Sequence, residues 1–249
     1  MLTQLSVGGE PLVLIMPKRD SDWRAVIKDA VARLNEEKTL HKQDRSRQRR
    51  AEILAAALRV FAREGIARAR INDIASEAGV PSASIYDYFD TKEELAYAVP
   101  IHQQTDFFAE FEERSRSLAT ARECLSEFLL LTADFARRHP DWARVLYLEV
   151  WPSVLIKEAR VRHVLDDYAR IVVRLIEEGA ERGEWPVQPD PYQTANILIG
   201  SLSQLIITWL LYRAPKQLTR AARLLVARLM LVLELTEVEQ PKKLKAVTA

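Results

Sequence analysis

Residues 71–89 read INDIASEAGVPSASIYDYF, and this stretch decides the fold. The apolar residues of its first half are spaced along one face of a short helix: Ile71, Ile74, Ala75 and Ala78. Gly79 follows, and glycine accepts the left-handed conformation that ends a helix. Pro81 and Ser82 suit the start of a second short helix. Two short helices joined by a glycine turn form a helix-turn-helix, whose second helix enters the major groove of DNA.

The second of these helices has a core face and an outward face. Ile85 and Phe89 are expected to point into the core. The side chains predicted to read bases are Ser82, Ala83, Ser84, Tyr86 and Tyr88. Arg and Lys make the commonest specific base contact. This helix contains neither, so it is expected to read DNA through hydroxyls, tyrosines and methyl contacts instead. Asp87 either accepts a hydrogen bond from cytosine or faces solvent or an intramolecular partner.

Charge is distributed unevenly around this motif. The whole chain has 36 basic and 35 acidic residues, so its overall charge does not indicate that it binds nucleic acid. Residues 41–70 hold nine basic and three acidic side chains, whereas 71–98 hold one basic and six acidic. Charge runs are usually solvated helix faces, but this one directly precedes the helix-turn-helix. It therefore favours a DNA-contacting arm, in which the side chains predicted to meet phosphates or a minor groove are Arg45, Arg47, Arg49 and Arg50.

Over residues 48–98 the motif order and spacing resemble the TetR (tetracycline-repressor-like) family of bacterial transcription regulators. The matching residues are Phe61, Gly65, Asp73-Ile74-Ala75, Ala78-Gly79-Val80, Ile85-Tyr86, Tyr88-Phe89 and Lys92-Glu93-Glu94-Leu95. The resemblance implies a homodimeric regulator, most often a repressor, whose helical domain binds a small-molecule effector that changes DNA affinity. It also implies phosphate contacts by Lys92, which opens the next helix, and by Arg70, where the family often has threonine.

The remaining chain is predicted to be helical, so the fold class is all-α. Residues 1–40 form an extension with one amphipathic helix at 22–38, and a short strand or arm within 8–19. Residues 41–98 form a three-helix helix-turn-helix DNA-binding domain, and 99–249 a helical effector-binding and dimerisation domain. The expected helices lie at 44–65, 71–78, 82–88, 91–117, 120–138, 141–150, 154–182, 190–213 and 216–237. Pro100 is expected to break or kink the fourth of these and to act as a hinge between the domains.

Aromatic residues of the middle helices are candidates for an effector pocket: Phe107, Phe108, Phe111, Phe128, Trp142, Tyr147, Trp151 and Tyr168. Each could equally be ordinary core packing. As a set they suggest a bulky apolar or amphipathic effector, such as a fatty-acyl or aromatic compound.

The last two helices are apolar around most of their surface, which favours burial against a second copy of the chain. The residues predicted for this dimer interface are Leu198, Leu202, Leu205, Trp209, Leu224 and Leu231. A two-fold dimer would set two reading helices one DNA turn apart on a palindromic operator.

Other classes of protein find little support in the sequence. The four histidines show no metal-ligand spacing, and no glycine-rich phosphate loop or G-x-S-x-G motif occurs, so no catalysis, metal or cofactor is expected. Cys124 is the only cysteine and is expected to be buried. The apolar run 196–212 contains several polar residues, which favours a buried helix over a membrane span. A cytoplasmic location is expected.

Two questions stay open. The arginine-free reading helix would also suit an interaction protein that keeps this fold but binds DNA weakly or without specificity. The helix at 22–38 could bind a partner, cover the reading helix or dock on its own domain, or it could belong to a segment that is not normally made.

Overall fold

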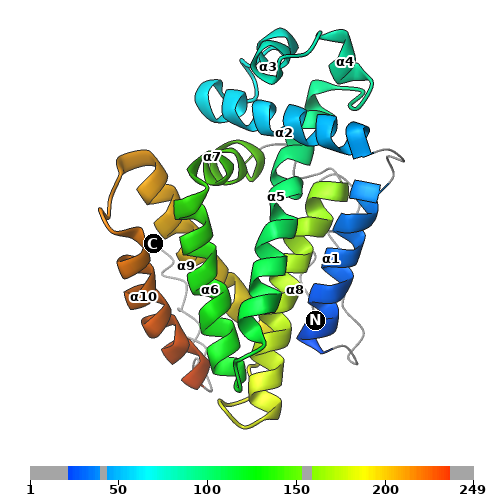
Figure 1. Cartoon of the computed structure of the whole chain (residues 1–249). Helices are drawn as coiled ribbons and strands as arrows, with labels where there is room; N and C mark the ends of the chain where they lie inside the picture. Colours follow the sequence, from blue (N-terminus) through cyan, green and yellow to red (C-terminus); the bar gives the residue numbers. More distant parts are fainter. Residues whose placement is uncertain (1–21, 40–43, 153–158, 236–249) are drawn as a thin grey trace, which may run out of the picture.

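The computed structural model describes residues 22–39, 44–152 and 159–235, and every regular element within them is a helix. Figure 1 shows a small upper part beneath which a larger group of long helices is packed. The elements are α1 (Trp23–Thr39), α2 (Asp44–Glu64), α3 (Ile71–Ala78), α4 (Ala83–Tyr86), α5 (Lys92–Ser115), α6 (Ala121–Arg138), α7 (Pro140–Arg144), the π-helix η1 (Val145–Val150), α8 (Ala159–Glu181), α9 (Pro191–Tyr212), α10 (Leu218–Leu229) and the 3-10 helix η3 (Met230–Glu234). The all-α prediction is confirmed. The strand or arm predicted within 8–19 and the helix start predicted at 154 lie outside the described residues.

The small upper part, called the reading head below, consists of α2, α3, α4 and the first turns of α5. The larger part, called the effector domain below, consists of α1, the rest of α5 and the elements from α6 to η3. The core of the reading head is separate from it, and the side chains at its centre are fully buried: Phe61, Ile74, Ile85 and Leu95. Gly79 has φ 67°, and its N–H and that of Val80 bond back to carbonyls of α3. The turn between α3 and α4 is thus the one that the glycine predicted, although α4 is shorter than the predicted 82–88.

Helix α5 connects the two parts and does not break at Pro100. It is one continuous α-helix from Lys92 to Ser115. Proline removes one backbone hydrogen bond, but Val99 and Ile101 on either side of Pro100 are buried in the two cores. Packing on both sides therefore keeps the helix intact where local chemistry predicted an interruption. The predicted hinge role of Pro100 stays a prediction.

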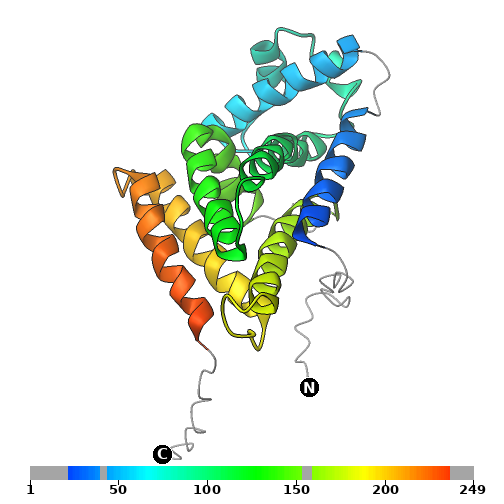
Figure 2. The same ribbon diagram turned by 60° about the horizontal axis from the view of Figure 1, so that its bottom comes forward.

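Helix α1 docks on the effector domain. It lies along α5 and α8, and in both views it lies at the opposite side of this domain from α10 (Figures 1 and 2). The inward side chains Trp23, Val26 and Ile27 are each at most 1% exposed. The amphipathic helix predicted at 22–38 is present, and its apolar face is covered by the chain's own domain.

Two of the residues predicted for the dimer interface belong to the interior. Leu198 and Leu202 are fully buried in the effector-domain core, so their assignment to an interface is wrong. Leu205 and Trp209 are half-buried, whereas Leu224 and Leu231 on α10 are 60% and 64% exposed. The helical period explains the error, because an all-round apolar helix presents one side to its own core and another outward. Among the described residues, α9 is also the helix long and apolar enough to cross a membrane, and it packs here as a core helix.

His139 ends α6 and is half-buried, with its ring 4.3 Å from that of Phe135. Burial, reinforced by the nearby Arg138, lowers the pKa of His139 below its ordinary value of 6.5. The unfolded chain therefore takes up this proton at a higher pH than the folded protein does. As a result, the histidine destabilises the fold as pH falls through 6.5 and into the range of its lowered pKa.

We expect His139→Gln to reduce the loss of stability on acidification. Urea unfolding of both proteins at about pH 8 and about pH 5 measures this, because only the lower pH protonates the unfolded-state histidine. The measurement at the higher pH is the control for lost packing. Equal losses of unfolding free energy between the two pH values would contradict the prediction.

Candidate nucleic-acid interface and effector cavity

Helix α4 lies at one end of the molecule (Figure 1), and the side chains predicted to read bases are exposed or half-buried there. Tyr86 is 54% exposed. Ala83 is also exposed, and Ser82, Ser84 and Tyr88 are half-buried. The hydroxyl of Ser82 lies 2.7 Å from Oδ1 of Asn72 on α3, which orients the start of the reading helix. This face can offer hydroxyl, phenol and methyl groups to base edges.

The basic start of α2, defined by Arg45, Arg47, Arg49 and Arg50, lies beside the end of α4. Its first three arginines are exposed. The guanidinium of Arg50 stands over the ring of Phe89 at 4.9 Å, which ties this segment to the residues that follow the reading helix. Arg49 forms an ion pair of 3.1 Å with Glu52. The structure thus brings the predicted arm and the reading helix together on one side of the head.

Lys92 has a different role from the phosphate contact predicted for it. Its ammonium group donates to the backbone carbonyls of Ile66, Ala67 and Ala69 at 2.9, 3.2 and 3.2 Å. An ammonium has three donors, so these carbonyls occupy all of them, and the phosphate assignment is wrong in this structure. Sequence could not show this, because the turn after α2 meets Lys92 only in the fold. Arg70 is exposed at the start of α3.

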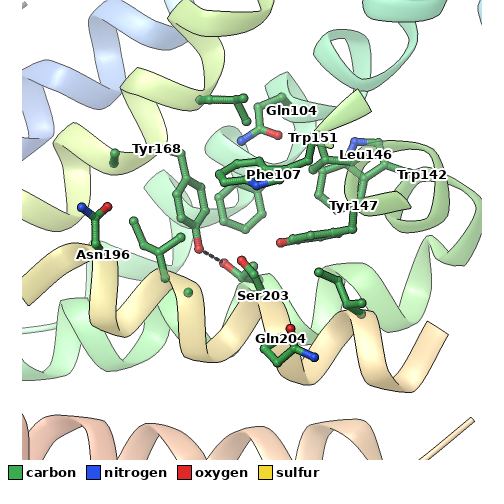
Figure 3. A pocket seen from close by; sticks show the side chains of 16 residues that line it. Gln104, Phe107, Trp142, Leu146, Tyr147, Trp151, Tyr168, Asn196, Ser203 and Gln204 are labelled. Atoms are coloured by element: carbon green, nitrogen blue, oxygen red, sulfur yellow. Dashed lines mark hydrogen bonds between the residues drawn. The ribbon is translucent and has the colours of Figure 1, made fainter. Parts of the chain in front are cut away.

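A cavity of about 330 Å³ lies inside the effector domain, between α5, α6, η1, α8 and α9 (Figure 3). Of the predicted pocket residues, five line it: Phe107, Trp142, Tyr147, Trp151 and Tyr168. The other three, Phe108, Phe111 and Phe128, are packed into the core, so their assignment to the cavity lining is wrong. The lining residues that the sequence did not suggest are Gln104, Thr132, Leu146, Leu165, Ala169, Asn196, Ile199, Gly200, Ser203, Gln204 and Ile207.

The missed residues come largely from α9. The sequence contained one hint of them, since Asn196, Ser203 and Gln204 interrupt an otherwise apolar run. These positions are polar because their side of α9 forms one wall of the cavity. The apolar spacing predicts only a core and dimer helix, because spacing does not reveal which side of a helix faces a cavity.

The described residues that line this cavity are polar in places but uncharged: none of these sixteen is Asp, Glu, Lys, Arg or His. The hydroxyls of Tyr168 and Thr132 are hydrogen-bonded at 2.8 Å. Burial raises the pKa of both Tyr147 and Tyr168, so these phenols remain neutral donors. A charged group placed here would lose its hydration without gaining a counter-charge. The cavity therefore suits an apolar ligand, or part of a ligand, that contains neutral hydrogen-bonding groups.

The π-helix η1 joins the cavity to the reading head. Leu146 and Tyr147 line the cavity, whereas Val145 and Val150 are buried in the core of the head. Next to them, the carboxylate of Glu149 accepts a hydrogen bond of 3.0 Å from the N–H of Ile66, in the turn that follows α2. A movement of η1 towards or away from the cavity would therefore displace residues that pack against the DNA-binding helices.

A metal site does not appear in the described ranges 22–39, 44–152 and 159–235. No group of three or more His, Cys, Asp or Glu side chains there could hold a metal ion. Cys124 is buried, as expected, and burial raises its pKa to about 11. A reactive cysteine needs the opposite, a lowered pKa in an electropositive environment.

Comparison with known proteins gives consistent matches from the middle of α2 to the 3-10 helix η3. The family model described as bacterial regulatory proteins, tetR family, matches residues 53–99, and the model for the YsiA-like protein C-terminal region matches 102–232. The fatty acid metabolism regulator protein of Bacillus subtilis is 28% identical, over 64% of this chain and 82% of that protein. The transcriptional regulator TtgR of Pseudomonas putida is 30% identical, over 68% of this chain and 83% of that protein.

Solved structures share the fold. The transcriptional regulator FadR from Bacillus subtilis, in complex with stearoyl-CoA, superimposes with a TM-score of 0.68 at 24% identity, over 72% of this chain and 96% of that one. The fatty acid degradation regulator FadR from Bacillus halodurans gives a TM-score of 0.67 at 22% identity, over 72% and 97%. Both matched chains are therefore covered almost completely.

Proposed function

Because this chain belongs to the TetR family of bacterial transcription regulators, we propose that it is a repressor that binds a palindromic operator as a homodimer and is released by an effector. The observation that supports this most directly is η1, whose side chains are shared between the cavity and the reading head. A ligand that fills the cavity can thereby change the position of the head. The protein would act in the cytoplasm, without catalysis or a cofactor.

In this proposal the reading face and the basic start of α2 contact DNA together. The face of α4 would enter the major groove and read bases through Ser82, Ala83, Ser84, Tyr86 and Tyr88. The arginines of α2, with Arg70, would contact phosphates and supply the attraction that α3 and α4 lack. In the dimer, two heads about 34–36 Å apart would meet successive major grooves. The exposed Leu224 and Leu231 of α10, with Ile197 and Leu211 of α9, offer an apolar face for the second copy.

For the effector we propose the acyl part of a fatty acyl thioester, with its charged carrier outside the cavity. The lining, as far as the structure describes it, is uncharged: these residues fit an acyl chain and a neutral thioester, and none of them is a cation that could pair with a free carboxylate. The relative from Bacillus subtilis is named a fatty acid metabolism regulator, and a solved structure of the same fold holds stearoyl-CoA. Stearoyl-CoA should therefore release operator DNA at a lower concentration than stearate does.

The function is tested by selecting bound DNA from genomic fragments and mapping the protected site. We expect a tight palindromic site, from which stearoyl-CoA releases the protein and coenzyme A alone does not. Weak binding without sequence preference would instead support the alternative, an interaction protein that retains this fold.

A charge placed inside the cavity should weaken the response to effector. Gln104 is 5% exposed and lines the cavity. Gln104→Glu keeps its shape but buries a carboxylate beside the acyl chain, so we expect at least about a tenfold loss of affinity for stearoyl-CoA. Operator affinity without ligand should change little, because Gln104 lies far from the reading face along α5. Fluorescence anisotropy of labelled operator, titrated with stearoyl-CoA, measures both quantities.

Gln204→Glu is the matched control, since Gln204 lies at the exposed edge of the same cavity. It should respond to stearoyl-CoA nearly as the unmodified protein does. A Gln104→Glu protein with an unchanged response would show that the effector does not occupy this cavity.

A further inference from the structure

Helix α1 lies outside both family matches, which cover residues 53–99 and 102–232, yet it is integrated into the effector domain. Its buried side chains belong to the same core as the cavity-lining Phe107. The ring of Trp23 lies 5.6 Å from that of Phe111 on α5. The helix is therefore a built part of the effector domain rather than a free extension.

A continuous series of aromatic contacts connects α1 to the cavity. Phe111 contacts Phe128 at a ring distance of 4.8 Å, and Phe128 contacts Tyr168 at 4.7 Å. Tyr168 lines the cavity, as does Phe107, which also contacts Phe128. Helices α5 and α8, on which α1 is docked, are themselves cavity walls. Because cores are close-packed, a ligand that displaces Tyr168 or Phe107 would move the surface on which α1 rests.

The other end of α1 leads directly to the basic start of α2. Only four residues separate Thr39 from Asp44, so the ends of the two helices cannot be more than about 18 Å apart. The exposed arginines Arg45 and Arg47 follow Asp44 in the first turn of α2. The arm that would contact DNA is thus tethered at its beginning to the effector domain.

We propose that α1 is a strap that couples the position of the basic start of α2 to the occupancy of the effector cavity. Trp23 is its positioning residue. This proposal rests on the proposed function. An occupied cavity displaces α1, which withdraws the arginines from the DNA. The strap acts in addition to η1, which reaches the opposite end of α2. Effector binding then weakens both the docking of α4 in the major groove and the contacts of the α2 arginines with phosphates.

The test uses the full chain and the salt dependence of operator affinity, with stearoyl-CoA as probe. In the unmodified protein, stearoyl-CoA should reduce the slope of log affinity against log salt by about 2, because about two phosphate contacts are lost. It should also lower affinity by about 5- to 150-fold. In Trp23→Ala the arm is no longer tethered, so the slope should be the same with and without stearoyl-CoA, and the loss of affinity should shrink several-fold. A purely structural role of Trp23 would not change the ligand dependence of the slope.

Lys28→Ala is the control on the exposed side of α1 and should behave as the unmodified protein. Trp23→Phe, which keeps an aromatic contact with Phe111, should restore the response. If Trp23→Ala does not fold, hydrogen exchange of the unmodified protein decides: amides of α1 must change protection on operator binding.

The outcomes separate the two proposals. If stearoyl-CoA releases DNA and Trp23→Ala shows the same change of slope, the strap is refuted while the proposed function stands. If stearoyl-CoA fails to release DNA, the proposed effector is refuted, and the strap is then decided by hydrogen exchange on operator binding alone. Unchanged protection of α1 amides in that experiment refutes the strap as well.

Discussion

Replacing Arg45 and Arg47 together with alanine should lower operator affinity by about 10- to 100-fold at physiological salt. It should also reduce the slope of log affinity against log salt by about 2, since each phosphate contact contributes about 0.9. Both arginines are exposed at the start of α2. The helix-turn-helix segment itself is acidic, with six acidic residues against Lys92, whose ammonium is occupied by carbonyls. In the proposed interface the arm would thus be the main source of attraction to phosphate. Titration of labelled operator at a series of salt concentrations measures both effects.

The matched control is the pair Arg116→Ala and Arg137→Ala, two exposed arginines of the effector domain. This pair removes the same charge from a site that the proposed interface does not include. Its slope should remain that of the unmodified protein. Equal effects of the two pairs would mean that net charge, rather than the arm, sets the attraction, and an unchanged slope in the first pair would remove the arm from the interface.

Gly179→Ala should destabilise the fold by about 1–3 kcal/mol. A methyl group at Gly179 on α8 would lie 1.9 Å from the ring of Trp185. That ring is 4% exposed, and its N–H donates to the carbonyl of Ile176 at 2.9 Å, so it cannot shift without losing this bond. Overpacking costs about 1–3 kcal/mol and a lost hydrogen bond about 1 kcal/mol, and the better helix propensity of alanine offsets about 0.5–1 kcal/mol of this. Urea unfolding followed by circular dichroism gives the difference.

Gly200→Ala makes the same chemical change inside α9, where a methyl group would meet nothing within 4 Å in the chain. Alanine loses less conformational freedom in a helix than glycine, so this variant should be more stable by about 0.5–1 kcal/mol. The two substitutions are therefore expected to have opposite signs. A destabilisation of similar size in both would show that the contact with Trp185 is not the cause in Gly179→Ala.

The reading head could be predicted from sequence because its determinants are local. Gly79 must adopt a left-handed conformation wherever it ends α3, and the spacing of Ile74 and Ile85 sets their burial without reference to the rest of the chain. The helices of the effector domain were found for the same reason, since period and breakers are local properties.

The errors concern contacts between distant segments. Lys92 was assigned to phosphate because its position at a helix start is visible in the sequence, whereas the carbonyls that occupy it come from a turn 23–26 residues away. Phe111 and Phe128 are of the same residue type as the cavity-lining Phe107. Only the packing of the folded chain distinguishes a residue in a filled core from one in a cavity wall. Leu198 was placed at an interface because an all-round apolar helix does not show which of its sides the chain covers itself.

The division of η1 between the two cores has a consequence for engineering. Regulators with new inputs are built by grafting one protein's reading head onto another's effector domain. The obvious junction here would be near residue 98, but the core of the head extends to Val145 and Val150, far along the chain. A graft cut at that junction would leave a hole in the head and its Ile66 N–H without Glu149. The exchangeable unit is therefore discontinuous: it contains α2 to the start of α5 together with residues 145–150, and a successful hybrid must transplant or rebuild both pieces.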